Sequence, residues 1–122
     1  MSESPAASVL VVDDDTGVRT LSRVILELEG FVVREAASLE QADAALAEER
    51  PDVVLLDVHL GHTPSDSLFD RLRADGIPVI AVTGTVDVAE YRGRSDAALM
   101  KPFEPDELVE ITRRLVSKVP ET

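Results

Sequence analysis

The chain has 122 residues, enough for one domain, and its 24 acidic and 12 basic side chains give a net charge of −12 at pH 7. Phosphate backbones would repel so acidic a domain, so direct nucleic-acid binding is not expected. The absence of cysteine excludes disulfides and thiolate metal sites. The sequence has no secretory signal, and no apolar run approaches the roughly 20 residues of a membrane span, so a cytoplasmic protein is expected.

Residues 8–50 predict a strand, a helix, a second strand and a second helix. The strands are short apolar runs, and the helices place apolar residues three and four positions apart. Gly30 ends the first helix as a C-terminal cap would, and Ser38 begins the second in a capping-box relation with Gln41. The first three elements are Ser8–Val12, Thr16–Glu29 and Phe31–Glu35. The predicted buried face of the first helix consists of Val18, Leu21, Ile25 and Leu28.

The second half of the chain continues the alternation. A third strand, Val53–Leu56, ends at Asp57, residues 60–65 have turn chemistry, and a helix over Asp66–Asp75 closes at Gly76. The remaining elements are a strand Pro78–Val82, a short helix over 86–92, a strand Ala97–Met100 and a helix that begins at Pro105. The inward residues predicted for the two longer helices are Leu68, Phe69, Leu72, Leu108, Ile111 and Leu115.

Five strands that alternate with five helical patterns predict an α/β fold with a doubly wound parallel sheet covered on both faces. We expect one domain over residues 8–117, with loose tails at 1–7 and 118–122. In such a sheet, ligands bind at the carboxyl ends of the strands, close to the place where the strand order reverses.

Polar side chains end most of these strands, at what should be a single edge of the sheet. Asp13 and Asp14 follow the first strand and Asp57 ends the third, while Glu35 ends an outer strand that would lie away from the site. The fourth and fifth strands end in Thr83 and Lys101. Neighbouring carboxylates stay ionised together when a cation joins them, and oxygen ligands without cysteine favour Mg²⁺. A nucleophilic aspartate beside a metal, a hydroxyl and an ammonium predicts a phosphoryl-transfer site.

These motifs resemble the receiver domain of two-component response regulators. The resemblance covers roughly residues 8–117 and is carried by Val-Val-Asp-Asp-Asp, Leu-Leu-Asp-Val, Ala-Val-Thr-Gly and Leu-Met-Lys-Pro-Phe, in that order and spacing. It implies a flavodoxin-like fold with strand order 2-1-3-4-5 and five helices. It also implies a cis bond between Lys101 and Pro102, and a phosphoryl group that Asp57 accepts from a histidine kinase or a histidine phosphotransfer protein. The implied Mg²⁺ ligands are Asp13, Asp14, Asp57 and the backbone carbonyl of His59, and the implied phosphoryl contacts are Thr83 and Lys101.

The sequence departs from that family in two places. Ala98 stands three positions before Lys101, where the family usually has an aromatic side chain that swings inward upon phosphorylation. The loop after Asp57 lacks the usual Met-Pro and is longer. Residues 77–85 resemble a subset of stand-alone receivers without the switch aromatic. Without the aromatic, a different surface or the loop after Asp57 would have to carry the signal. We expect the output to be a protein–protein contact through the face built from the last two strands and helices, made by a monomer or a phosphorylation-dependent dimer.

Other hypotheses stay open at this point. A phosphate sink or shuttle, or a degenerate receiver that binds partners without phosphate, would share most of these features. The pattern of Asp13, Asp15 and Thr16 also resembles the Asp-x-Asp motif of small metal-dependent phosphatases, in which Asp13 would be the nucleophile. Asp15 has the simpler role of a helix cap, and His59 with His62 would need further ligands to form a metal pair. On the leading hypothesis the chain is not an enzyme with its own substrate.

Overall fold

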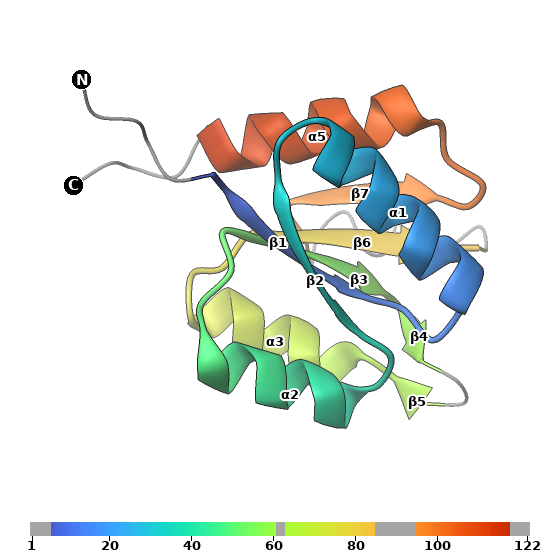
Figure 1. Cartoon of the computed structure of the whole chain (residues 1–122). Helices are drawn as coiled ribbons and strands as arrows, with labels where there is room; N and C mark the ends of the chain where they lie inside the picture. The colour runs from blue at the N-terminus through green and yellow to red at the C-terminus, as the bar shows by residue number, and fades with distance from the viewer. Residues whose placement is uncertain (1–5, 61–62, 85–94, 118–122) are drawn as a thin grey trace, which may run out of the picture.

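The computed structural model describes residues 6–60, 63–84 and 95–117, and these form a parallel five-stranded sheet between two layers of helices (Figure 1). The sheet order is β2-β1-β3-β6-β7, which is the predicted order of the second, first, third, fourth and fifth strands. The strands are β1 (Ser8–Val12), β2 (Val32–Ala36), β3 (Val53–Asp57), β6 (Val79–Thr83) and β7 (Ala97–Met100). The predicted flavodoxin-like fold and its strand order are confirmed.

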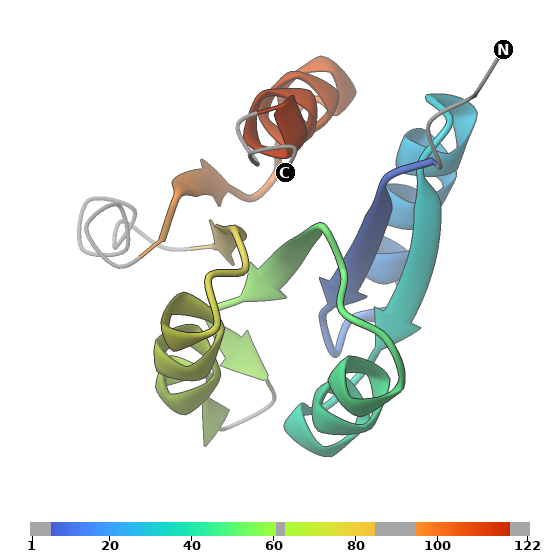
Figure 2. The same cartoon turned by 90° about the vertical axis from the view of Figure 1, so that its left-hand side faces the viewer.

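Helices lie on both faces of the sheet (Figure 1, Figure 2): among the described residues, α1 (Thr16–Leu28) and α5 (Pro105–Ser117) cover one face, and α2 (Leu39–Glu48) and α3 (Asp66–Ala74) cover the other. Val9 and Val11 of β1 point to one face and pack in a cluster with residues of α1 and α5. Leu10 and Val12 point to the other face and pack with residues of α2 and α3. Because both faces of the central strands are buried, their sequences are continuous apolar runs rather than alternating ones.

Parts of the sequence prediction fall outside the described residues. These are the short helix expected over 86–92, and the expected tails apart from Ala6 and Ala7. The prediction of turn structure over 60–65 was wrong in one respect, because β4 (His59–Leu60) and β5 (Thr63–Pro64) pair as a short antiparallel hairpin after β3. No helix within the described ranges combines the length and the apolar character needed to cross a membrane.

The predicted buried face of α1 was partly wrong. The fully buried residues of this helix are Ser22 and Leu26, whereas Leu21 and Leu28 are 56% and 80% exposed. Apolar residues occupy so wide an arc of α1 that their spacing alone does not fix how the helix is rotated on the sheet. Small Ser22 faces the interior and leaves part of the apolar arc at the surface, close to the carboxyl edge of the sheet.

The ends of the helices follow from short-range chemistry. The Asp15 side chain caps α1 by accepting a hydrogen bond from the Val18 amide at 3.1 Å, which confirms its predicted capping role. Gly30 follows the same helix with a φ of 95°, a backbone conformation in which a residue with a side chain would be strained. The Ser38 hydroxyl accepts a hydrogen bond from the Gln41 amide at 3.1 Å, so the predicted cap of α2 is also present. The cap at Asp15 fixes the turn that carries the acidic residues after β1.

Candidate functional site

The carboxyl edge of the sheet brings three carboxylates together. β1 and β3 are neighbours with Val12 opposite Leu56, so the next residues, Asp13 and Asp57, lie at the same level. One carboxylate oxygen each from Asp13, Asp14 and Asp57 lies within 4.8 Å of the other two. Asp13 and Asp57 are buried and Asp14 is exposed. The cluster is therefore built by the parallel strand register and opens to solvent on the side of Asp14.

Lys101 joins this cluster from the end of β7. Its Nζ lies 3.0 Å from Oδ2 of Asp13 and 3.4 Å from Oδ2 of Asp57. Its backbone amide donates to the carbonyl of Thr83 at 2.7 Å, and the bond to Pro102 is cis, as the family resemblance implied. Burial works against the charged ammonium, but hydrogen bonding to Asp13 and the charges of Asp57 and Asp13 outweigh it and raise the pKa of Lys101 above its ordinary 10.5.

Asp57 is the carboxyl group that this environment perturbs most clearly. Burial, followed by repulsion from Asp13, raises the pKa of Asp57 from 3.8 to about 6. The charge of Lys101 and a hydrogen bond from the His59 amide, at 3.3 Å from Oδ1 of Asp57, oppose this rise without cancelling it. The carboxylate of Asp57 is thus available near neutral pH, but in an environment that still lacks positive charge.

Because the pKa of Asp57 is raised, the metal-free wild-type protein should be less stable above about pH 6 than a variant with a neutral side chain at this position. The folded state binds the Asp57 proton more tightly than the unfolded chain, so the group contributes stability at low pH and loses it as the pH rises from 3.8 through about 6. Asp57→Asn, which stays neutral, is therefore expected to raise the free energy of unfolding on the order of 3 kcal/mol at about pH 8. Urea unfolding in EDTA measures this difference, which should narrow at about pH 5. Equal stability of the two proteins at both pH values would contradict the assigned environment of Asp57.

The donor set suits a divalent cation that prefers oxygen ligands. Three ionised carboxylates and the ammonium of Lys101 leave a charge of −2, which such a cation would neutralise. Asp14 is exposed, so hydrated Mg²⁺ could reach the cluster and keep several of its waters. The His59 side chain is exposed, and His62 lies outside the described residues, as does any pairing of the two histidines. Thr83 is fully buried at the end of β6, one residue beyond the partner of Asp57.

Ser65 is a residue of this site that the sequence analysis missed. It is fully buried, and its hydroxyl donates to the backbone carbonyl of Asp57 at 2.6 Å, while its amide donates to the carbonyl of Val58 at 3.1 Å. Although Ser65 directly precedes α3, its side chain makes no capping hydrogen bond. It instead holds the backbone that carries Asp57. A serine before a predicted helix indicates a cap, so this contact with the Asp57 backbone could not be predicted from the local pattern.

Comparisons with known proteins identify relatives of the chain. DNA-binding response regulator MtrA of Mycobacterium leprae is 37% identical over 106 residues, which cover 83% of this chain and 47% of that protein. The phosphate regulon transcriptional regulatory protein PhoB of Pseudomonas aeruginosa is 36% identical over 110 residues, which cover 84% and 48%. The chain thus spans about half the length of these curated relatives.

A solved structure and a family model agree with these relatives. The crystal structure of a CheY-like response regulator receiver domain protein from Methanospirillum hungatei matches with a TM-score of 0.85 and 28% identity, over 93% of this chain and 96% of that one. The family model of the response regulator receiver domain matches residues 9–113. The chain therefore belongs to the family of response regulator receiver domains.

Proposed function

We propose that this receiver domain accepts a phosphoryl group on Asp57 from a histidine kinase or a histidine phosphotransfer protein, and that the modified domain signals by a protein–protein contact. The observation that carries this proposal is the convergence of Asp13, Asp14 and Asp57, with the ammonium of Lys101 3.4 Å from the Asp57 carboxylate. Transfer of a phosphoryl group requires a nucleophilic carboxylate with positive charge beside it, and here Lys101 and a divalent cation held by the acidic cluster would supply that charge.

The chemistry follows from the positions of these residues. An oxygen of the Asp57 carboxylate attacks the phosphorus of a phosphohistidine, and an O–P bond forms as the P–N bond breaks, so that the imidazole nitrogen leaves with its electron pair. Lys101 then holds the phosphoryl oxygens by charge, and Thr83 contributes a hydrogen bond from its hydroxyl. Water later attacks the acyl phosphate and regenerates the Asp57 carboxylate with inorganic phosphate.

The acidic residues would hold the metal ion that this family uses. Asp13, Asp14 and Asp57, with the backbone carbonyl of His59, are the proposed Mg²⁺ ligands. A bound Mg²⁺ supplies positive charge to the phosphoryl oxygens during transfer. Asp13 is already fixed for this role, because its Oδ1 accepts a hydrogen bond from the Asp15 amide at 2.9 Å. Such an anchored carboxylate needs little rearrangement on binding a cation.

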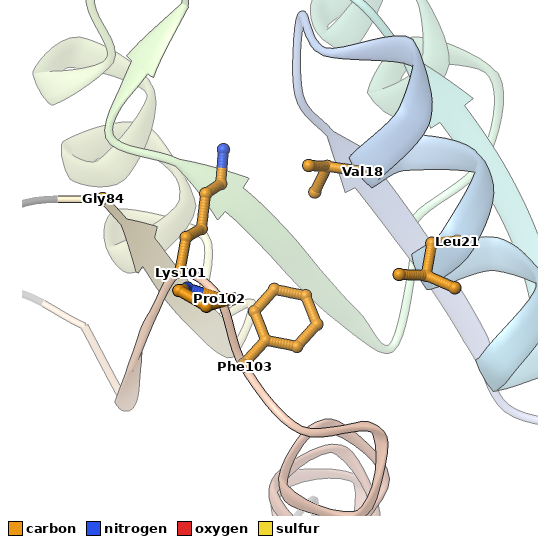
Figure 3. Close-up of a pocket in the computed structure, with 6 residues that line it drawn as sticks. All are labelled: Val18, Leu21, Gly84, Lys101, Pro102 and Phe103. Carbon is orange, nitrogen blue, oxygen red and sulfur yellow. The ribbon is translucent and has the colours of Figure 1, made fainter.

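A surface for the donor protein lies beside the acceptor. A cavity of about 350 Å³ separates α1 from the segment after β7, with Val18 and Leu21 on one side and Phe103 on the other (Figure 3). Lys101 also lines it and pairs with Asp57, so this cavity adjoins the acidic site. An apolar side chain of the donor would fit here while its phosphohistidine faces Asp57.

We also propose an output surface and a cellular location for this domain. Ala98 stands opposite Ala81, at the position where the family usually has its switch aromatic. We therefore place the output contact on the face built by β6, β7 and α5, at residues other than Ala98. MtrA is named as a DNA-binding protein, but the matched region spans about half of it. With a net charge of −12, this domain itself is proposed to make no direct contact with nucleic acid, and to work in the cytoplasm.

Labelling with a small phosphodonor tests this function. With Mg²⁺ and acetyl phosphate, we expect a new species whose intact mass is greater by one phosphoryl group and no species with more, and we expect phosphomonoesters to remain intact. Continuous hydrolysis of a phosphomonoester that Asp13→Asn abolishes and Asp57→Asn preserves would instead identify a phosphatase with Asp13 as nucleophile. No increase in mass under any of these conditions would identify a receiver that works without phosphate.

A further inference from the structure

Arg19 connects the outer strand β2 to the acidic turn after β1. Its Nη1 donates to the backbone carbonyl of Asp13 at 2.7 Å, and its Nε donates to Oε1 of Glu35 at 3.0 Å. The guanidinium is largely buried, with 16% of the side chain exposed. Glu35 is the residue before the last in β2, and it also pairs with Arg23, whose Nε lies 3.3 Å from Oε2. Two arginines one helical turn apart therefore share one carboxylate, but only Arg19 is seen to reach Asp13.

The contact with Arg19 completes the restraint of Asp13. The amide of Asp13 donates to the carbonyl of Ala36 at 3.0 Å, and its Oδ1 accepts from the Asp15 amide at 2.9 Å. With the carbonyl held by Arg19, the backbone and the carboxylate of Asp13 are both fixed by the protein before any cation binds. The planar guanidinium suits this task, because one edge can bind Glu35 while a second nitrogen reaches the carbonyl.

We propose that Arg19, itself held by Glu35, is a positioning residue of the acidic site, and that it sets the affinity for Mg²⁺ by fixing Asp13. The inference rests on the proposed function, in which Asp13 is a metal ligand. Groups that orient metal ligands through a hydrogen bond influence affinity strongly, and their loss commonly weakens binding about 10–100-fold. Glu35, which the sequence analysis placed away from the site, acts through Arg19 rather than by contact with the metal.

Variants of the two arginines separate positioning from general stability. Arg19→Gln is expected to weaken Mg²⁺ binding about 10–100-fold in calorimetric titration, and Glu35→Gln to weaken it less, because a glutamine oxygen can still accept from Nε. Arg23→Gln is the matched control: it removes a cation from the same helix and the same carboxylate, and should leave the Mg²⁺ affinity unchanged. Arg19→Lys keeps the positive charge but cannot donate to Glu35 and to the Asp13 carbonyl in the same way as a guanidinium, so its Mg²⁺ affinity should stay below that of the wild type.

A measurement without metal gives an independent readout. In the Mg²⁺-free protein, Arg19→Gln should accelerate hydrogen exchange of the Asp13 amide, while Arg23→Gln should not. Unchanged Mg²⁺ affinity in Arg19→Gln would overturn the proposal, and so would equal weakening by Arg23→Gln or full rescue by Arg19→Lys. If the wild-type protein binds Mg²⁺ but takes up no phosphoryl group, the proposed function fails while this inference stands. If only the affinity comparison fails, the proposed function is untouched.

Discussion

Lys101→Met is expected to slow phosphorylation of the domain by acetyl phosphate about 10²–10³-fold at saturating Mg²⁺, because the ammonium that would hold the phosphoryl oxygens is lost. The Nζ of Lys101 lies 3.4 Å from Oδ2 of Asp57 and 3.0 Å from Oδ2 of Asp13, where it faces both carboxylates. Its charge also lowers the pKa of Asp57, so its removal should raise this pKa further above 6 and reduce the nucleophilic carboxylate at neutral pH. The measurement is the initial rate of mass increase.

The effect of Lys101→Met must be separated from loss of metal and loss of fold. Since Lys101 is a cation that competes for the same carboxylates, Mg²⁺ binding by the variant is expected to be preserved or tightened. Arg71→Met removes a cation from an exposed ion pair with Asp43 on the far helices α2 and α3, and should leave the rate unchanged. A rate equal to that of the wild type in folded Lys101→Met would show that the ammonium has no part in the transfer.

The sheet could be predicted from local sequence patterns, and so could the clustering of polar residues at the carboxyl ends of its strands. β1 and β3 are buried on both faces, so each is a continuous apolar run that stops at an aspartate. Once the strands are parallel, their carboxyl ends share one edge, and this alone places Asp13 beside Asp57. The same reasoning placed Lys101 correctly, since β7 ends directly before it.

The contacts that depend on how one element is turned against another could not be predicted. The apolar arc of α1 is wide, and the choice that buries Ser22 and exposes Leu21 is made by packing against β2 and α5. The same rotation brings Arg19 over the end of β2, where it binds Glu35. Similarly, the hairpin β4–β5 places Ser65 beneath Asp57, although its sequence indicated only a turn and a helix start.

The acceptor residue is the second position at which a large effect is expected. Asp57→Asn should abolish Mg²⁺-dependent phosphorylation completely, because the amide lacks the nucleophilic carboxylate while keeping the shape of the side chain. Asp52→Asn is a matched control, since this aspartate lies at the opposite end of β3 and accepts a hydrogen bond from the Ser8 amide at 2.7 Å. That variant should be labelled like the wild type.

Chemical mapping of the acyl phosphate is the most direct test of the central claim, that one aspartate of the acidic cluster, Asp57, accepts the phosphoryl group. Reduction of the labelled protein with borohydride converts an acyl phosphate into an alcohol, so a phosphorylated aspartate becomes homoserine. After labelling with Mg²⁺ and acetyl phosphate, peptide sequencing by mass spectrometry should find homoserine in place of Asp57, with Asp13 and Asp14 unchanged. Homoserine in place of Asp13, or a labelled protein whose Asp57 is intact, would contradict the account.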